Sequence, residues 1–378
     1  MPASGITEVF ARGFGRPGLI PLWAGEGDLP TPDFVREAAK ASLNAGETFY
    51  LPQRGMPPLR EALAAYDARV YGERSQGGPE RFTVTTGGMH AVQIAMRLAC
   101  DAGDEVLVPT PAWPNFAGAA AAAGIKPVFV PMDFSPNGWT LDLERLEGAI
   151  TERTRAIVVN SPSNPTGWTA SLEDLEALLA LARRRGLWIL ADEIYNRFML
   201  NGEARAPSFK DVMAPEDAVV FVQTLSKNWA MTGWRVGWIE APAALGATID
   251  SLVQVSTSGI PAFAQRAAVA ALEGGEAFIA EQVARAREGL DALRAAFDAI
   301  PGAAYAPPSG AFYLFVRMPG VANTRSFALG LVDRHGLGVA PGTAFGPGGE
   351  AFMRLCFLRS RGDLEEAARR FVGAAGRA

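Results

Sequence analysis

Three polar residues stand at or just after the ends of apolar runs, and their side chains suit chemistry on a carbonyl group. Lys227 follows VVFVQTLS, Asp192 ends LWILAD and Asn160 ends AIVVN. A lysine in a site of low dielectric constant can lose its proton and attack a carbonyl carbon. A buried aspartate can hold a cation, such as a protonated pyridine nitrogen.

A second set of residues suits an anion. TTGGMH (85–90) precedes a helix, so Gly87 and Gly88 would expose backbone N–H groups to a phosphate. Thr224 and Ser226 could add hydroxyl donors, and Arg235 could add a guanidinium that binds two oxygens. Each feature alone is common in proteins that bind no ligand there, so the argument depends on their combination.

The two sets together describe one ligand. Asn164 in NSPSNPTG and Tyr195 in ADEIY can donate to a phenolate. A phosphate, a pyridinium, a phenolate and an aldehyde occur together in pyridoxal 5′-phosphate. The protein signature of this cofactor is a lysine Schiff base with an acidic partner for the ring nitrogen. The residues therefore predict a pyridoxal-phosphate site.

The elements that must position these residues alternate along the middle of the chain. Short apolar runs, typical of strands covered on both faces, are expected at 104–110, 126–131, 155–165 (ending in a Pro/Ser/Asn loop), 187–195 and 218–226. Helices are expected at 92–100, 116–124 and 172–186. This alternation predicts an α/β fold with a mostly parallel sheet, in which the ligand site lies at the carboxyl ends of the strands.

The pattern changes near residue 280. One long amphipathic helix is expected at 276–299, followed by strand-like segments at 310–318 and 350–358 around a helix near 324–335. We therefore expect a large cofactor-binding domain over residues 40–280. Residues 1–39 and 281–378 would form a smaller α+β domain.

Composition excludes several other classes of protein. The 378 residues are 49% hydrophobic and carry a net charge of −5, which argues against nucleic-acid binding. No run of about 20 apolar residues could span a membrane. The sequence has two cysteines and no apolar leader, so a reducing, cytoplasmic setting is expected. With only two histidines, His90 and His335, neither a metal site nor a Ser-His-Asp triad is expected.

Longer motifs carry a family resemblance. In chain order they are AGEGDLPTP, YLPQRGMPPLR, TTGGMHAVQ, PTPAWPNF, NSPSNPTG, ADEIY, SKNWAMTGWRVGW, SGAFY and MRLCF. Over about residues 20–360 the sequence resembles the class I/II, fold-type I pyridoxal-phosphate aminotransferases of the aspartate aminotransferase superfamily. The resemblance implies pyridoxal 5′-phosphate as cofactor. It also implies ping-pong transfer of an amino group from an L-amino acid to a 2-oxo acid.

The resemblance implies roles for individual residues as well. Lys227 would form the Schiff base and then carry the proton, Asp192 would pair with the pyridine N–H, and Tyr195 and Asn164 would donate to the phenolic oxygen. The phosphate would be bound by Gly87, Gly88, Met89, Thr224, Ser226 and Arg235. Relatives commonly have serine or glycine where Thr224 stands, which is a mild departure. Trp113 would stack on the ring, and the substrate carboxylate would lie near Arg354, Gly25 and Asn160.

Two further features follow from the resemblance. Tyr50 in YLPQRGMPPLR would reach the phosphate of a neighbouring subunit, which implies a homodimer with shared active sites. Cis peptide bonds are expected before Pro111 and Pro165.

The amino-acid donor is less determined than the reaction. Met89 stands where some dicarboxylate-specific relatives have a lysine, so we expect neutral or aromatic donors, or a broad range. Aspartate as donor remains an alternative, because Arg16, Arg54 or a cation of a second subunit could bind a distal carboxylate. A pyridoxal-phosphate-dependent C–S lyase is the catalytic rival, and it would release ammonia and pyruvate.

Overall fold

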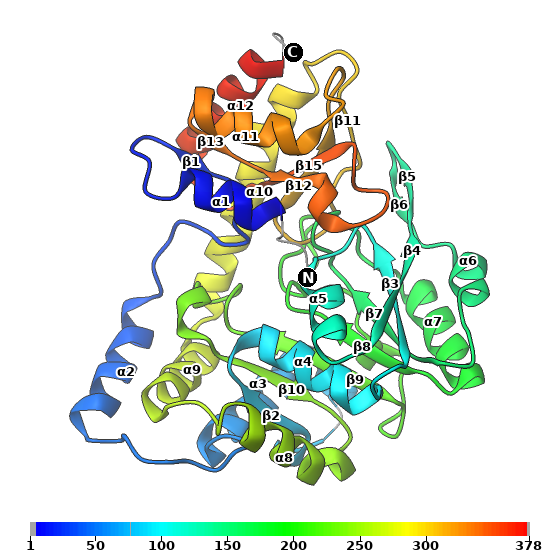
Figure 1. The fold of residues 1–378 in the computed structure, drawn as a ribbon. Helices are drawn as coiled ribbons and strands as arrows, with labels where there is room; N and C mark the ends of the chain where they lie inside the picture. The colour runs from blue at the N-terminus through cyan, green and yellow to red at the C-terminus, as the bar shows by residue number, and fades with distance from the viewer. Residues whose placement is uncertain (1–4, 76, 376–378) are drawn as a thin grey trace.

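The structure, a computed structural model, describes residues 5–75 and 77–375. Figure 1 shows a seven-stranded sheet with its helices in one part of the molecule and a smaller sheet with its helices in the other. The long helix α10 (Glu276–Phe297, yellow) runs from the larger part into the smaller one.

The large sheet is mostly parallel, as predicted. Its strands, in spatial order, are β2 (Phe82–Thr85), β10 (Gly237–Glu240), β9 (Val219–Thr224), β8 (Trp188–Asp192), β7 (Thr154–Asn160), β3 (Glu105–Thr110) and β4 (Lys126–Pro131). Only β10 runs against its neighbours. All the other strands therefore end at the same edge of the sheet.

Side chains of the central strands alternate between two apolar layers. Along β7, Ala156 and Val158 face one layer, whereas Ile157 and Val159 face the other. The first layer is closed by α4 (Gly87–Ala99), α5 (Asn115–Ala122) and α8 (Gly246–Ser256), and the second by α6 (Leu143–Gly148) and α7 (Leu172–Arg185). Burial of both faces explains why these strands are continuous apolar runs in the sequence.

The ends of α7 show how the sequence sets element boundaries here. Ser171 accepts from the Asp174 N–H, and the Asp174 side chain accepts from the Ser171 N–H, which forms a capping box. At the other end Gly186 has a positive φ of 63°. The strand β8, which ends at Asp192, begins two residues later.

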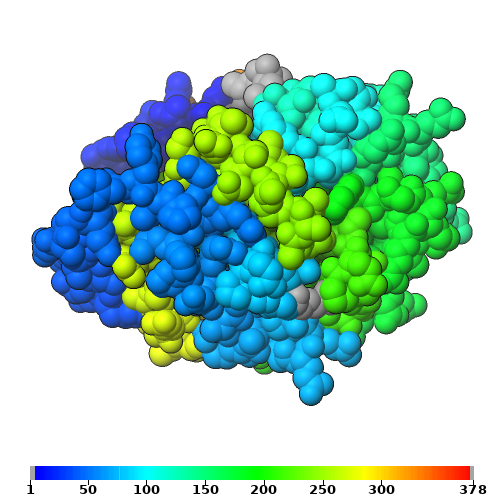
Figure 2. Space-filling model, turned by 90° about the horizontal axis from the view of Figure 1, so that it is seen from below, coloured from blue at the N-terminus to red at the C-terminus, as the bar shows by residue number. Residues whose placement is uncertain are grey.

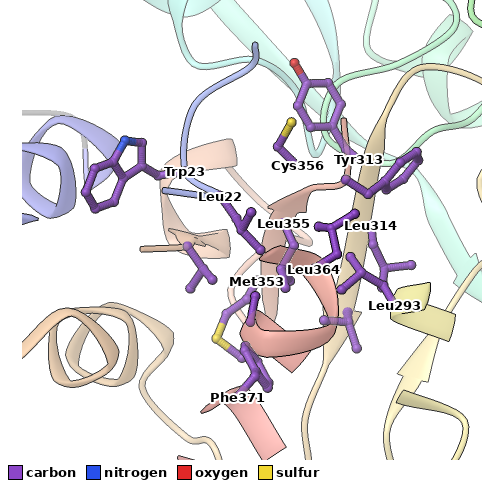
Figure 3. Packing of buried hydrophobic residues seen from close by; sticks show 14 of the residues in the cluster. Leu22, Trp23, Leu293, Tyr313, Leu314, Met353, Leu355, Cys356, Leu364 and Phe371 are labelled. Atoms are coloured by element: carbon purple, nitrogen blue, oxygen red, sulfur yellow. The ribbon is translucent and has the colours of Figure 1, made fainter. Parts of the chain in front are cut away.

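The smaller part holds a four-stranded sheet of β11 (Ala304–Tyr305), β12 (Tyr313–Arg317), β15 (Phe352–Cys356) and β14 (Ala340–Pro341). It packs with α1 (Gly5–Gly13), α10, α11 (Thr324–His335) and α12 (Arg361–Ala375). Figure 3 shows its apolar core, where Leu314, Met353 and Leu355 of the sheet lie between Leu293 and Phe371 of the helices. The helices predicted at 276–299 and 324–335 are therefore present.

The N-terminal segment divides between the two parts. β1 (Ile20–Pro21) pairs in parallel with β13 (Leu337–Gly338) of the smaller part. In contrast, α2 (Asp33–Asn44) packs against α9 (Ala262–Gly274), which also contacts α3 (Pro57–Tyr71). The predicted domain boundary at residues 39 and 40 falls inside α2, so we propose that the large part begins near Asp33.

Other details extend the predicted pattern. Cis peptide bonds precede Pro111 and Pro165, as predicted, and a third precedes Pro162. A hairpin of β5 (Asp133–Ser135) and β6 (Gly138–Thr140) lies beyond the end of β4. Within the described residues, no helix is long and apolar enough to cross a membrane.

Candidate active site

A cavity of about 530 Å³ lies where the carboxyl ends of the large sheet meet the smaller part. Its walls include the ends of β7, β8 and β9, the start of α4, and residues of α1 and β15. The predicted site residues that line it are Gly25, Gly88, Met89, Trp113, Asn160, Asn164, Asp192, Tyr195, Thr224, Ser226, Lys227, Arg235 and Arg354.

Lys227 lies three residues beyond β9, and its amine faces the cavity. Its Nζ donates to the backbone oxygen of Gly25 at 2.6 Å and lies 6.0 Å from the centre of the Tyr195 ring. Burial lowers the pKa of this amine to about 8, against the pull of Glu26. A far larger share of Lys227 is therefore neutral near physiological pH than for an ordinary lysine, although the protonated form still predominates.

Asp192 ends β8 and is 2% exposed. Burial raises the pKa of its carboxyl to about 7, while the Ile194 N–H, which donates to Oδ1 at 3.4 Å, and the charge of Lys227 oppose that rise. Asn160 fixes the same strand end, because its Nδ2 donates to the backbone oxygen of Asp192 at 3.1 Å. A cation placed against Asp192 would keep the carboxylate ionised.

The start of α4 forms an anion cradle with the turn between β9 and β10. Gly87 has a φ of +74°, and a Cβ there would come within 2.5 Å of the Arg235 guanidinium. Gly237 at the start of β10 is equally constrained, since a Cβ there would lie 2.8 Å from the Gly88 N atom. Gly87 and Gly237 therefore let the start of α4 lie close to the Arg235 guanidinium and to the start of β10, an arrangement suited to an anion.

The hydroxyl groups beside this cradle are already ordered. Thr224 Oγ1 lies 2.9 Å from Ser226 Oγ and 3.0 Å from the backbone oxygen of Val236, and it accepts from the Ser226 N–H at 3.1 Å. A hydroxyl has only one proton to donate. Thr224 therefore serves as an anchor for the loop, and Ser226 is the better donor to an anion.

Arg354 projects from β15 into the cavity while its residue stays 3% exposed. Its guanidinium donates to Asn164 Oδ1 at 3.0 Å and to the backbone oxygen of Trp23. The Tyr313 and Phe345 rings lie 4.6 Å and 5.1 Å from the guanidinium carbon. This planar cation, held in place by two rings, is suited to a carboxylate.

Tyr195 is fixed by a residue that the sequence reasoning named only within a motif. Its hydroxyl lies 2.7 Å from the hydroxyl of Tyr313, the tyrosine of SGAFY. Burial raises the pKa of both phenols, so both stay protonated and able to donate. Tyr313 is therefore a site residue that the motif could have indicated.

Of the residues considered from the sequence, His90 and Tyr50 do not line the cavity, and neither does Gly87, the first residue of α4. His90 accepts from the Thr86 N–H at 3.1 Å and pairs with Ser256 of α8 at 2.8 Å, so it caps α4 and faces away from the ligand. Tyr50 is 93% exposed on the surface of its own chain. The proposed contact of Tyr50 with a phosphate therefore requires a second subunit.

Other cavity residues had no motif to indicate them. These include Ile6, Thr7 and Phe10 of α1, together with Trp23, whereas Asn115 and Ile194 also line the cavity but lie within the motifs PTPAWPNF and ADEIY. The helix is amphipathic, but nothing in its sequence shows which part of the protein it covers. Trp113 lies among these residues, and its ring meets Phe116 edge to face at 5.4 Å.

The site fits pyridoxal phosphate on three independent observations. The glycine cradle would be filled by a Cβ at position 87, which is typical of a built anion site. Asp192 is a buried acid at the end of a strand that a pyridinium would neutralise. Lys227 is a buried amine with a lowered pKa between these two groups.

Comparisons with known proteins agree with this chemistry. The family model for aminotransferase class I and II matches residues 17–371. The chain is 37% identical to aspartate/prephenate aminotransferase of Thermus thermophilus, with 95% of this chain and 92% of that protein covered. It is 34% identical to an arginine–pyruvate transaminase of Pseudomonas aeruginosa over 94% and 89% of the two chains.

The fold is also similar to that of a solved aminotransferase structure. The aspartate aminotransferase of Thermus thermophilus with maleate superposes with a TM-score of 0.89 at 36% identity, covering 99% of this chain and 97% of that one.

Proposed function

Because this chain belongs to the class I and II aminotransferases, whose cofactor is pyridoxal phosphate, we propose that it transfers amino groups from neutral or aromatic L-amino acids to a 2-oxo acid. The observation that carries the proposal is the convergence of Lys227, Asp192 and Arg354 on one cavity whose further walls are largely apolar. The reaction itself follows from the family, and the donor range is our inference from the walls.

The bound cofactor supplies an electron sink that makes the Cα–H of an attached amino acid acidic. In the proposed role, the Lys227 amine would accept the Cα proton and donate it again. Its amine is suited to both tasks because its pKa of about 8 lies close to neutral pH. Asp192 would hold the ring nitrogen in its protonated form.

The remaining chain residues orient the reactants. The N–H groups at the start of α4, with Ser226 and Arg235, hold the phosphate end, and the tyrosine pair holds the phenolic edge. Arg354 binds the substrate carboxylate, and because its guanidinium donates to Asn164 Oδ1, the Asn164 Nδ2 is the atom that would donate to the phenolic oxygen. We infer that the substrate side chain then extends toward α1, whose Ile6 and Phe10 line the cavity.

The wall that would receive the substrate side chain carries no charge on this chain. Among the described residues that line the cavity, the only cations are Lys227, Arg235 and Arg354, and each has a proposed role already. The other walls include Ile6, Phe10, Trp23, Met89 and Ile194. Such a surface favours an uncharged side chain, because an unpaired carboxylate there would lose its hydration.

Aspartate is the second candidate donor, and the names of relatives favour it. Aspartate/prephenate and arginine–pyruvate transaminases match this chain at 37% and 34% identity, so relatives at this distance differ in substrate. Arg16 pairs with Asp333, and Arg54 donates to Thr83, so neither reaches the cavity. Recognition of aspartate would therefore require a cation from a second subunit.

The test is a scan of the first half-reaction. Cofactor-loaded protein is mixed with single amino acids and no oxo acid, and released 2-oxo acid and ammonia are measured. We expect about one equivalent of oxo acid per site, without ammonia, and fastest release from phenylalanine, tyrosine or leucine. Release from aspartate and glutamate alone would overturn the donor range, and continuous ammonia production would indicate a lyase.

We further propose a homodimer in which Tyr50 completes the neighbouring site. Phe49 and Tyr50 are 84% and 93% exposed, and Val255 of α8 is 81% exposed. Figure 2 shows the blue segments that follow α1 beside the yellow-green α8–α9 region on one face. Gln265 of α9 accepts from the Met56 N–H at 2.8 Å, which joins the two regions. Such a face is suited to a second copy of the chain.

We also propose a cytoplasmic location. Cys100 and Cys356 are both free and buried, so neither contributes a disulfide. Cysteines used in this way are typical of proteins in reducing compartments.

A further inference from the structure

The buried face of α10 contains a polar residue that the proposed mechanism does not use. Its buried side chains are otherwise apolar, and Gln282 stands among them between Ile279 and Ala286. Gln282 is 1% exposed, and its Oε1 has no hydrogen-bond partner among the described residues. A buried amide oxygen left without a hydrogen-bond partner is unfavourable, so we expect a donor to it that the described residues do not supply.

Gln282 lines a small polar cavity that Lys227 also lines. The cavity has a volume of about 20 Å³ and is distinct from the 530 Å³ site. Its polar lining residues are Glu26, Ser226, Lys227, Thr232 and Gln282. A single water needs roughly 10–15 Å³ and two to four polar partners, and this cavity offers both.

We propose that this cavity binds one buried water molecule, which Gln282 anchors beneath the amine of Lys227. The water would bridge the Gln282 amide to the polar groups around the lysine. Gln282 is then a positioning residue that acts on Lys227 from behind, without touching the substrate. The water site stands on the cavity and the amide alone, whereas its effect on turnover rests on the proposed function.

The surroundings of Lys227 explain why such a water would matter. The titratable and charged groups that act on the amine are Glu26, Cys356, Arg354 and Asp192, and burial is the dominant influence. Glu26 is held by the Thr232 hydroxyl at 2.7 Å, and the Cys356 thiol donates to its backbone oxygen. A water at this point solvates the ammonium form, so it opposes the effect of burial.

The test compares three variants of the cofactor-free protein. Gln282→Met keeps the side-chain volume and removes the amide, Gln282→Glu adds a charge, and Ile279→Met changes packing one turn away on the same face. A high-resolution crystal structure shows whether a water occupies the cavity. The pH dependence of Lys227 acylation, followed by mass spectrometry, gives the pKa of its amine.

We expect water density in the wild type and in Ile279→Met, and none in Gln282→Met. The pKa of the Lys227 amine should fall by about one unit in Gln282→Met, because a solvating group is lost, and rise in Gln282→Glu. Ile279→Met should leave it unchanged. A dry cavity in the wild type, or an unchanged Lys227 pKa in Gln282→Met, would overturn the proposal.

These measurements remain informative if the proposed function is wrong. Neither the water density nor the acylation of Lys227 depends on cofactor or substrate. If Gln282→Glu does not fold, the comparison of Gln282→Met with Ile279→Met still shows whether Gln282 holds a water and affects the pKa of Lys227. Failure of the half-reaction scan would leave both readouts in place.

Discussion

Asp192 is buried and Lys227 is partly buried at the same cavity, and burial moves their pKa values in opposite directions. Burial brings the amine down to about 8 and the carboxyl up to about 7. The pKa of the amine is lower in the folded protein than in the unfolded chain, so stability rises with pH between those two pKa values. The pKa of the carboxyl is higher in the folded protein, so stability falls as pH rises between its two pKa values. Near neutral pH both groups therefore cost stability in the cofactor-free protein, and a cationic ring against Asp192 removes part of that cost.

The first prediction concerns the pH dependence of cofactor capture. Only the neutral amine can attack the aldehyde, so the capture rate should rise about tenfold between pH 7 and pH 9 as the amine titrates near 8. Stopped-flow absorbance of the cofactor-free protein mixed with pyridoxal phosphate measures this. A midpoint near 10.5, the value of an ordinary lysine, would show that the amine is not desolvated.

The second prediction concerns Arg354. In Arg354→Lys the planar pair of donors is lost, so kcat/KM for every donor should fall about 10–100-fold, as for one charged hydrogen bond. Steady-state kinetics with several amino acids measures it. Arg317→Lys is the matched control, because Arg317 also lies over two aromatic rings, at 5.5 and 6.0 Å, but outside the cavity. A loss confined to one donor would contradict a role in binding the common carboxylate.

At the scale of elements, the start of α4 can be tested through its backbone. Gly87→Ala adds a Cβ within 2.5 Å of Arg235 at a φ of +74°, so it should weaken pyridoxal-phosphate binding at least tenfold. Gly186→Ala at the end of α7 has a similar φ of +63° but open space around the new Cβ.

Comparing these two glycine variants separates strain from cradle geometry. Gly186→Ala should lower the free energy of unfolding by about 1–2 kcal/mol and leave cofactor affinity unchanged. Fluorescence titration and chemical unfolding measure the two quantities. Equal cofactor affinity in both variants would argue against the cradle.

The helix α1 provides the next prediction. Phe10→Ala removes a ring from the cavity wall, so kcat/KM for large apolar donors should fall about tenfold, while alanine should be affected little. Phe14→Ala is the matched control, since the Phe14 ring lies 5.1 Å from the Phe10 ring in a tilted arrangement but is 72% exposed and lies outside the cavity. An equal loss for alanine and phenylalanine would mean that Phe10 acts on folding or catalysis in general.

The sequence predicts elements well where burial leaves a simple pattern. The runs at 104–110, 155–165, 187–195 and 218–226 each contain a strand because both faces of it are covered, and the last three strands end at Asn160, Asp192 and Thr224, before the loops that follow. The strands β2 and β10 were not predicted, because FTVT and GWIE are four residues long and owe their place to neighbours. The helices α1, α2, α3, α8 and α9 were also not predicted.

The candidate site divides in the same way. Lys227, Asp192 and Asn160 could be placed because each follows a strand whose end must lie at the ligand edge. Ile6 and Phe10 could not, since α1 reaches the cavity only by packing on α11 and β14 from a distant part of the sequence. Gln282 differs from both groups, because a polar residue within the apolar face of a predicted helix is visible in the sequence. It was not predicted to be a site residue.

At the scale of the whole molecule, the proposed dimer makes a prediction about shared sites. Tyr50→Ala and Lys227→Ala should each be nearly inactive. If Tyr50 serves the partner, a mixed dimer of the two variants has one site with both residues intact, so statistical mixing should restore about a quarter of wild-type activity. Co-expression with two affinity tags, followed by activity assay, measures this. Phe49→Ala is the control for the loss of an exposed ring beside Tyr50.

No recovery in the mixed dimer, with both variants folded and dimeric, would mean that Tyr50 serves its own chain or no site at all. A monomeric wild-type protein in sedimentation experiments would remove the shared-site proposal entirely.

The position of α1 also bears on how such proteins diversify. Its nine residues belong to the smaller part, where Glu8 pairs with Arg325 and Arg12 with Asp333. The residues proposed to hold the cofactor lie on other elements. A gene duplicate could therefore change its substrate range through substitutions along one short helix. The residues proposed for catalysis would stay unchanged, so specificity could diverge without loss of the reaction.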